Sequence, residues 1–231
     1  MSRSDNRVSQ QHSTDVERAI AAFQTGEAVL IHDDDDREAE TDLLFPAAGI
    51  THERIAQLRN DAGGLLFVAL AADVADAFEL PFLHDVIEHP ANDHSDLSYD
   101  ARPSFSLSVN HRDTYTGITD ADRARTVSAL ATAAAAARAG EYDAEAFGAE
   151  FRTPGHVHLL RAADGLLAER QGHTEFGIAL AEAAGQPPAV VGCEMLDDET
   201  GGALSTPAAR DYAARHDLVF VEGAALLNAL R

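Results

Sequence analysis

The spacing of apolar residues predicts a chain of alternating helices and strands. Asp15 precedes apolar residues at helical intervals, from Val16 to Phe23, so a helix is expected from Asp15 until Gly26 ends it. Short apolar runs bounded by Gly, Pro or acidic residues predict strands at 28–31, 43–45, 65–70, 189–193 and 218–221. Residues 104–109 alternate with a period of two, which is typical of a half-buried strand.

The remaining helical patterns lie between these strands. Helices are expected at 51–61, 120–139, 174–184, from Thr206 onward, and at the end of the chain. Interleaved helices and strands with irregular inserts predict a layered mixed α/β (α+β) domain rather than a strict doubly wound sheet. No repeat or linker divides the chain, so we expect a disordered tail at residues 1–14 followed by a single domain at 15–231.

The charge balance changes the picture more than the apolar content, which is an ordinary 45%. The chain has 39 acidic residues and 17 basic residues, all of them arginine, for a net charge of −22. A lysine-free acidic surface is expected where salt screens its self-repulsion, which predicts a halophilic source. It also argues against nucleic acid as a partner, because binding there depends on basic groups.

Cysteine usage and hydropathy restrict the compartment. Cys193 is the only cysteine, so an intrachain disulfide is excluded and a reducing compartment is expected. No run approaches the roughly 18 apolar residues of a membrane span, and the polar start does not resemble a signal peptide. We therefore expect a cytoplasmic protein without a membrane partner.

The densest chemical signal is the segment from Asp33 to Asp42, in which seven of ten residues are acidic. In an extended segment Glu38 and Glu40 point the same way, as would Asp42, and such oxygen ligands suit Mg²⁺. Against so acidic a background, a plain solvated turn remains the alternative interpretation.

Three further segments combine turn residues with reactive side chains. Residues 115–123 place a glycine turn before a helix, where backbone amides can hold an anion. In residues 152–158 a Pro-Gly pair is expected to form a turn that presents His156, a residue type suited to proton transfer. In residues 170–175, Arg170 and Thr174 are candidates for holding a phosphate. A helix cap or a structural histidine would explain each segment alone, but together they indicate metal-assisted chemistry on a phosphorylated small molecule.

These segments carry a resemblance to a known family. The chain resembles 3,4-dihydroxy-2-butanone 4-phosphate synthase in five segments that follow one another in the same order as in that family. These segments are Asp-Asp-Asp-Asp-Arg-Glu-Ala-Glu-Thr-Asp (33–42), Thr-Gly-Ile-Thr-Asp-Ala-Asp-Arg (116–123), Arg-Thr-Pro-Gly-His-Val (152–157), Gly-His-Thr-Glu (172–175) and Gly-Cys-Glu-Met (192–195). The resemblance implies a Mg²⁺-dependent lyase of riboflavin biosynthesis that converts D-ribulose 5-phosphate into L-3,4-dihydroxy-2-butanone 4-phosphate and formate. Together with the acidic, lysine-free composition, it predicts a halophilic archaeon as the source. It also implies a three-layer sandwich around a mixed, twisted sheet, and a homodimer with active sites at the interface.

The same resemblance implies roles for individual residues. Two Mg²⁺ (or Mn²⁺) ions are expected on Glu38 and His173, and the groups expected in catalysis are His156, Glu194, Glu40 and Asp33. Substrate contacts are expected from Arg37, Glu38, Asp42, Arg170, Gln171, Gly172, His173, Thr174 and Glu194, with Arg170 and Thr174 on the phosphate. The acidic loop and the segment 81–99 are the candidate lids over reactive intermediates.

Two other functions remain open from the sequence. A different sugar-phosphate metalloenzyme, such as an aldolase or isomerase, would share the phosphate contacts, whereas a non-catalytic acidic protein would bind cations weakly at many places. A fused GTP cyclohydrolase domain, known in some relatives, is expected to be absent because no zinc-type cysteine set follows Glu194.

Overall fold

The computed structural model describes residues 3–33, 37–93, 97, 100 and 102–231, with the backbone alone for residues 3–13. The strands are β1 (Val29–His32), β2 (Thr41–Pro46), β3 (Phe67–Leu70), β4 (Phe105–His111), β5 (Phe151–Arg161), β6 (Ala189–Glu194) and β7 (Val219–Glu222). The α-helices are α1 (Arg3–Gln24), α2 (His52–Gln57), α3 (Ala72–Ala77), α4 (Leu83–Val86), α5 (Asp120–Arg138), α6 (Ala144–Glu150), α7 (His173–Ala183), α8 (Thr206–Arg215) and α9 (Gly223–Leu230). A π-helical turn (Leu58–Ala62) follows α2, and a 3₁₀ turn (Leu166–Ala168) precedes α7.

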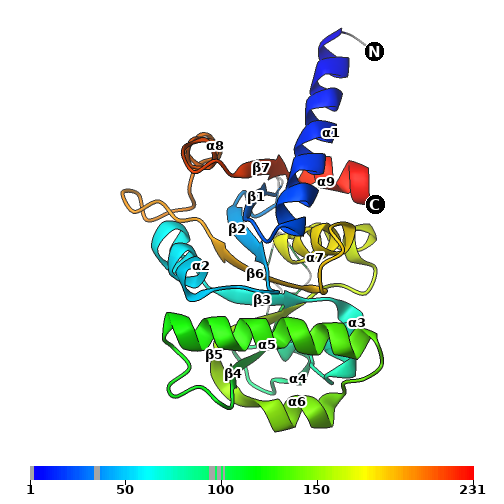
Figure 1. Cartoon of the computed structure of the whole chain (residues 1–231), viewed down its shortest axis with the longest axis vertical. Helices are drawn as coiled ribbons and strands as arrows, with labels where there is room; N and C mark the ends of the chain where they lie inside the picture. The colour runs from blue at the N-terminus through cyan, green and yellow to red at the C-terminus, as the bar shows by residue number, and fades with distance from the viewer. Residues whose placement is uncertain (1–2, 34–36, 94–96, 98–99, 101) are drawn as a thin grey trace.

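The described strands form one mixed sheet in the order β4-β5-β3-β6-β2-β1-β7 (Figure 1). β1 pairs in parallel with β7, and β3 pairs in parallel with β5. The other neighbouring strands are antiparallel. The mixed sheet expected from the sequence is confirmed.

Helices cover both faces of the central strands. Every residue of β2 and β3 is buried, which requires a packed layer on each face of the sheet. α7 contacts β1, β2, β3 and β6 and packs against α1 and α9, whereas α5 contacts β4, β5 and β6 and packs against α2 and α3. In Figure 1, α5 crosses in front of the sheet. The resulting architecture has three layers, as the resemblance implied.

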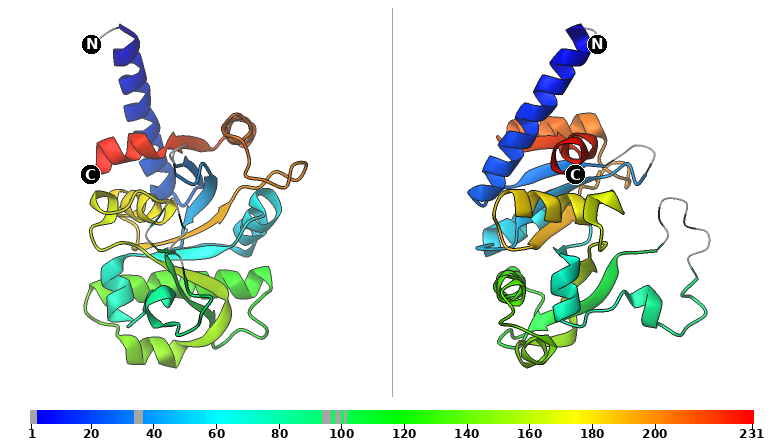
Figure 2. Two further views of the ribbon diagram at one scale, coloured as in Figure 1. Left: turned by 180° about the vertical axis from the view of Figure 1, so that it is seen from behind. Right: turned by 90° about the vertical axis from the view of Figure 1, so that its right-hand side faces the viewer.

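The first helix begins earlier than the sequence predicted. Residues 3–14 were expected to be a disordered tail, with a helix from Asp15, but α1 starts at Arg3. The segment is polar, but it contains no Gly or Pro that would stop a helix anchored by buried Val16, Ala19 and Phe23. The beginning of α1 therefore extends away from the rest of the molecule, as both views in Figure 2 show.

The Pro-Gly segment is a strand irregularity rather than the expected turn. Residues 152–158 lie inside β5, which runs from Phe151 to Arg161. Val109 of β4 pairs with Val157, but the next residue, Asn110, pairs with Arg152. Residues 153–156 are thus left out of the ladder and bulge from the strand. The helices α3, α4 and α6 were not predicted from the sequence.

Among the described residues, no helix combines the length and the apolar character that crossing a bilayer requires.

Candidate active site

Four segments meet where the sheet and α7 adjoin. β1 ends at His32, β2 begins at Thr41, β6 ends at Glu194, and α7 begins at His173. Because β2 is antiparallel to both β1 and β6, its first residues lie beside the last residues of those two strands. α7 packs across all three strands. The fold therefore brings together residues that are more than 150 positions apart in the sequence.

Asp42 and Glu194 form a carboxylate pair on one face of the sheet. They are direct partners in the β2–β6 register, so their side chains point the same way. Asp42 Oδ2 lies 3.7 Å from His173 Nδ1 on α7. Glu194 Oε2 accepts a 2.7 Å hydrogen bond from the Leu65 amide. A Cβ on Gly64 would lie 2.5 Å from this oxygen, so the glycine makes room for the carboxylate.

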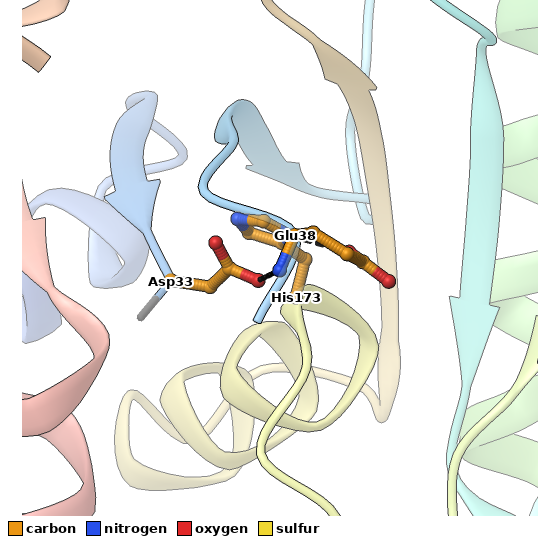
Figure 3. A group of neighbouring side chains, drawn as sticks. All are labelled: Asp33, Glu38 and His173. Atoms are coloured by element: carbon orange, nitrogen blue, oxygen red, sulfur yellow. Dashed lines mark hydrogen bonds and ion pairs between the residues drawn. The ribbon is translucent and has the colours of Figure 1, made fainter. Parts of the chain in front are cut away.

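Asp33, Glu38 and His173 form the candidate metal site (Figure 3). One ligand atom from each of them lies within 4.8 Å of the others, and Glu38 Oε2 is 3.6 Å from His173 Nδ1. His173 Nε2 and Asp42 Oδ1 are buried and accept or donate no hydrogen bond within the described part of the chain. Carboxylate oxygens beside an imidazole are suitable ligands for a divalent cation. The expected pair Glu38 and His173 is thus together, with Asp33 added to it.

Asp33 also fixes the backbone of the acidic loop. Its Oδ1 accepts a 3.0 Å hydrogen bond from the Glu40 amide, and its Oδ2 accepts from the Glu38 amide at 3.3 Å. Arg37 Nη1 donates to the same Oδ2 at 3.1 Å. The Asp33 side chain is completely buried, so these bonds hold Glu38 and Glu40 on the side of the loop that faces His173.

The electrostatics of this group differ from those of the surface acids. Burial raises the pKa of Asp42 to about 8, with the carboxylates of Glu194 and Glu40 adding to the shift against the attraction of His173. Burial and the neighbouring Glu38 raise the pKa of Glu40 above its ordinary value. For His173 burial favours the neutral ring, but attraction by Asp42 and the contact with Glu38 outweigh it and raise the pKa to about 9.

Glu38 behaves in the opposite way to the other two acids. Its partial burial favours the neutral form, but the contact with His173 and the charge of Arg37 hold its pKa below the ordinary value. Glu38 is therefore ionised while Asp42 and Glu40 retain protons more readily. Neighbouring carboxyl groups whose pKa values are shifted in opposite directions are typical of sites that transfer protons.

Two arginines form the other side of the site. Arg170 Nη1 contacts Glu175 Oε2 at 2.6 Å, and Arg170 Nε donates to Asp100 Oδ2 at 2.5 Å. Arg37 Nη2 donates to the same Asp100 oxygen at 3.2 Å. A Cβ on Gly172 would lie 2.5 Å from Arg170 Nη1 and 3.0 Å from Arg37 Nη2, so a residue without a side chain lets both guanidinium groups approach.

These groups surround a cavity of about 360 Å³. Its walls include the expected residues Arg37, Glu38, Glu40, Asp42, Arg170, His173, Thr174 and Glu194. Cations and carboxylates thus occupy one solvent-accessible space, which suits a small, anionic, hydroxyl-rich molecule.

His156 lies apart from this cavity. It belongs to the bulge of β5, is exposed, and does not line the cavity. The side chain of Asn110 holds it, since Oδ1 accepts from the His156 amide at 2.8 Å and Nδ2 lies 3.2 Å from His156 Nδ1. Gln171 is also exposed and outside the cavity wall. Within one chain, then, these two expected residues do not join the others.

Sequence reasoning missed several residues of the site. Asp100 and Ser104 line the cavity together with Phe67, and Glu175 supports Arg170 from behind. Glu175 is part of the Gly-His-Thr-Glu motif, so the sequence did contain a signal that could have identified it. Asp100 lies among many other acidic residues, and nothing in the sequence pattern distinguishes it from them. Of the two candidate lids, residues 34–36 and residues 94–96, 98 and 99 lie outside the described part of the chain.

Comparison with known proteins identifies the family of this chain. The family described as 3,4-dihydroxy-2-butanone 4-phosphate synthase matches residues 17–229. Proteins of that name from Archaeoglobus fulgidus and Methanosarcina mazei are 46% and 45% identical to this chain. The first match covers 94% of this chain and 94% of the relative, and the second covers 93% and 90%.

A solved structure of a 3,4-dihydroxy-2-butanone 4-phosphate synthase in complex with two magnesium ions has the same fold. It superimposes with a TM-score of 0.76 at 30% identity, covering 91% of this chain and 94% of that one. The expected family is confirmed: the chain belongs to the 3,4-dihydroxy-2-butanone 4-phosphate synthases, which are enzymes.

Proposed function

We propose that the cavity converts D-ribulose 5-phosphate into L-3,4-dihydroxy-2-butanone 4-phosphate and formate, a step of riboflavin biosynthesis. The observation that carries the proposal is the group of half-buried Glu38 with buried Asp42 and His173, next to the cationic pair Arg37 and Arg170. One side suits a divalent cation and the sugar oxygens, and the other suits a phosphate. The five carbons of the substrate divide into four and one, and the overall reaction requires no further reactant.

Glu38 and His173 are the proposed protein ligands of two Mg²⁺ ions, with Mn²⁺ as the alternative metal. The donor set fits, because Glu38 Oε2 lies 3.6 Å from His173 Nδ1, and the other ring nitrogen, Nε2, is buried without a hydrogen-bond partner among the described residues. Bound there, the metal would act as a Lewis acid that stabilises negative charge on neighbouring substrate oxygens. The protein's own part is to hold both ligands in place through Asp33 and the first turn of α7.

Arg170 and Thr174 are the proposed phosphate contacts. Arg170 is held by Glu175, and Thr174 is buried in the first turn of α7, where the helix dipole favours an anion. Anchoring the phosphate at this end directs the sugar carbons toward Glu38, Asp42 and His173. Asp42 and Glu194 then contact the sugar, Arg37 contacts the substrate beside Arg170, and Gly172 leaves the space that this placement needs.

The groups that transfer protons in this reaction should change their charge near neutral pH. Asp42 meets this condition because burial raises its pKa to about 8, and burial also raises the pKa of the neighbouring Glu40 above its ordinary value. Glu194 lies beside Asp42 and faces the same cavity. His156 is the proposed further acid or base, although it lies outside the cavity of its own chain.

A homodimer would reconcile the position of His156 with its role. His156 is exposed, and Tyr115 and Ile118 on a loop near its partner Asn110 are 94% and 51% exposed, which is unusual for large apolar residues. In a symmetric dimer each subunit's His156 would enter the other's cavity. Mixed dimers test this proposal, because Glu38→Ala and His156→Ala subunits would each lack a different half of the site.

Equal mixing of these two inactive variants should restore about one quarter of the wild-type activity, since half of random dimers would contain one intact site of two. No recovery after subunit exchange would refute a shared site.

The direct test of the function is an assay for formate from ribulose 5-phosphate, with and without Mg²⁺. Formate that depends on Mg²⁺ and disappears with EDTA is the expected result. Triose phosphates or an isomeric pentose would instead assign the site to an aldolase or isomerase, the second candidate. We further propose that the enzyme works in the cytoplasm, without nucleic acid or membrane partners, given its net charge of −22.

A further inference from the structure

Asp100 bridges the two arginines of the cavity through a single oxygen. Its Oδ2 accepts from Arg170 Nε at 2.5 Å and from Arg37 Nη2 at 3.2 Å. The Asp100 side chain is only 12% exposed and lines the cavity. An anionic group of this protein thus occupies the position where both guanidinium groups point.

Each arginine already has another carboxylate partner that holds it from inside the protein. Arg170 Nη1 contacts Glu175, whose side chain is completely buried and also accepts from the Ala163 amide. Arg37 Nη1 contacts Asp33 and Glu38, both at 3.1 Å. The orientation of the two arginines is therefore set without Asp100, and Asp100 contacts the donors that remain on the cavity side.

We propose that Asp100 is an internal substitute for the substrate's phosphate and makes the cavity selective for dianions. The proposal rests on the proposed phosphate contact of Arg170. When the phosphate binds, the Asp100 carboxylate leaves Arg170 Nε and Arg37 Nη2, and phosphate oxygens take its place. The exchange is non-covalent and breaks and forms only charge-assisted hydrogen bonds.

The selectivity follows from the number of oxygens and charges. Asp100 offers a single charge and contacts both arginines through one oxygen. A phosphate monoester is close to a dianion at neutral pH and can give a separate oxygen to each guanidinium. A monoanion in solution has no such advantage over Asp100, which is tethered and therefore present at a high effective concentration. Dianions displace Asp100, and monoanions do not.

Inorganic phosphate is the probe that tests this inference, measured by titration calorimetry at constant ionic strength on the full chain. If the bridged form makes up about nine-tenths of the free protein, Asp100→Asn should bind phosphate roughly tenfold more tightly than wild type. Acetate, a soluble carboxylate, should compete with phosphate in Asp100→Asn but not in wild type. Glu88→Gln removes the same charge from an exposed position and should leave phosphate affinity unchanged.

Equal or weaker phosphate binding by Asp100→Asn would overturn the inference and make Asp100 a residue that only positions the arginines. The same gain in Glu88→Gln would also overturn it, because the effect would then come from net charge. The formate assay keeps this result separate from the proposed function. If the wild type forms formate but Asp100→Asn binds phosphate with unchanged affinity, only the inference about Asp100 is refuted. If the wild type forms no formate, the proposed function is refuted.

Discussion

Asp42 is a buried carboxyl whose cost to stability can be predicted. Its side chain is 2% exposed, and burial raises its pKa from 3.8 to about 8. The unfolded chain releases this proton above pH 3.8, whereas the folded, metal-free protein keeps it until about pH 8. The carboxyl therefore destabilises the fold increasingly between these two pH values and contributes nothing below the lower one.

Replacing Asp42 by Asn removes this cost while nearly preserving shape. At pH 7 the penalty amounts to about 4 kcal/mol, because each pH unit above the unfolded pKa contributes roughly 1.4 kcal/mol. Part of it is offset, because the ionised fraction of Asp42 attracts His173 and Asn does not. We expect metal-free Asp42→Asn to be more stable by about 3 kcal/mol, a Tm increase of about 6–12 °C for a chain of this length.

Calorimetric melting in EDTA, at pH 4, 7 and 8.5, measures the effect. The difference from wild type should be near zero at pH 4 and largest at pH 8.5. Saturating Mg²⁺ should raise the Tm of wild type more than that of the variant, because an ionised Asp42 attracts the cation. Exposed Asp198→Asn is the matched control and should change stability by less than about 0.5 kcal/mol. A Tm decrease, or a difference independent of pH, would refute the reasoning.

Three further substitutions test other parts of the site. In steady-state kinetics, Arg170→Ala should raise the KM for ribulose 5-phosphate more than it lowers kcat, because a charge-assisted phosphate contact is lost. A larger effect on kcat than on KM would instead assign Arg170 to the chemical step. His156→Ala should lower kcat at least about 10²-fold, as expected for a general acid or base, whereas near-normal turnover would leave it a structural role. Glu175→Gln should cost about 3 kcal/mol in urea unfolding, because it leaves Arg170 without its buried partner. Glu182 lies on the same helix as Glu175 and forms a half-exposed pair with Arg138 of α5. Glu182→Gln should therefore cost less than about 1 kcal/mol, and equal losses in the two variants would contradict this reasoning.

The regular elements of the fold were predictable where the pattern was local. Buried runs such as Ala189–Cys193 and caps such as Thr119, whose hydroxyl accepts from the Asp122 amide, act within a few residues. β5 was missed because its pairing with β3 and β4 comes from distant segments, and these contacts override the local preference of Pro154 and Gly155 for a turn. The start of α1 was missed because polar composition was interpreted as disorder.

The Glu38 and His173 side of the site could be anticipated, but the partners of the two arginines could not. Glu38 and His173 were expected through the resemblance, and the structure brings them within 3.6 Å of each other. Nothing in the sequence links Asp100 to Arg37, since an ion pair between side chains 63 positions apart is set by tertiary packing. The separation of His156 from the cavity likewise follows from the order of the strands in the sheet, and the spacing of residues along the sequence does not predict it.

The pairing of β1 with β7 has a consequence for the synthesis of this protein. The strand that leads into the acidic loop is completed by the last strand of the sheet, with Val29 opposite Val219. During translation, β1 has no neighbour on that side until the ribosome has added some 190 further residues, which takes on the order of ten to forty seconds. Until then its open edge can pair with other chains. A premature stop before Val219 should therefore yield an aggregating product, not a weakened enzyme.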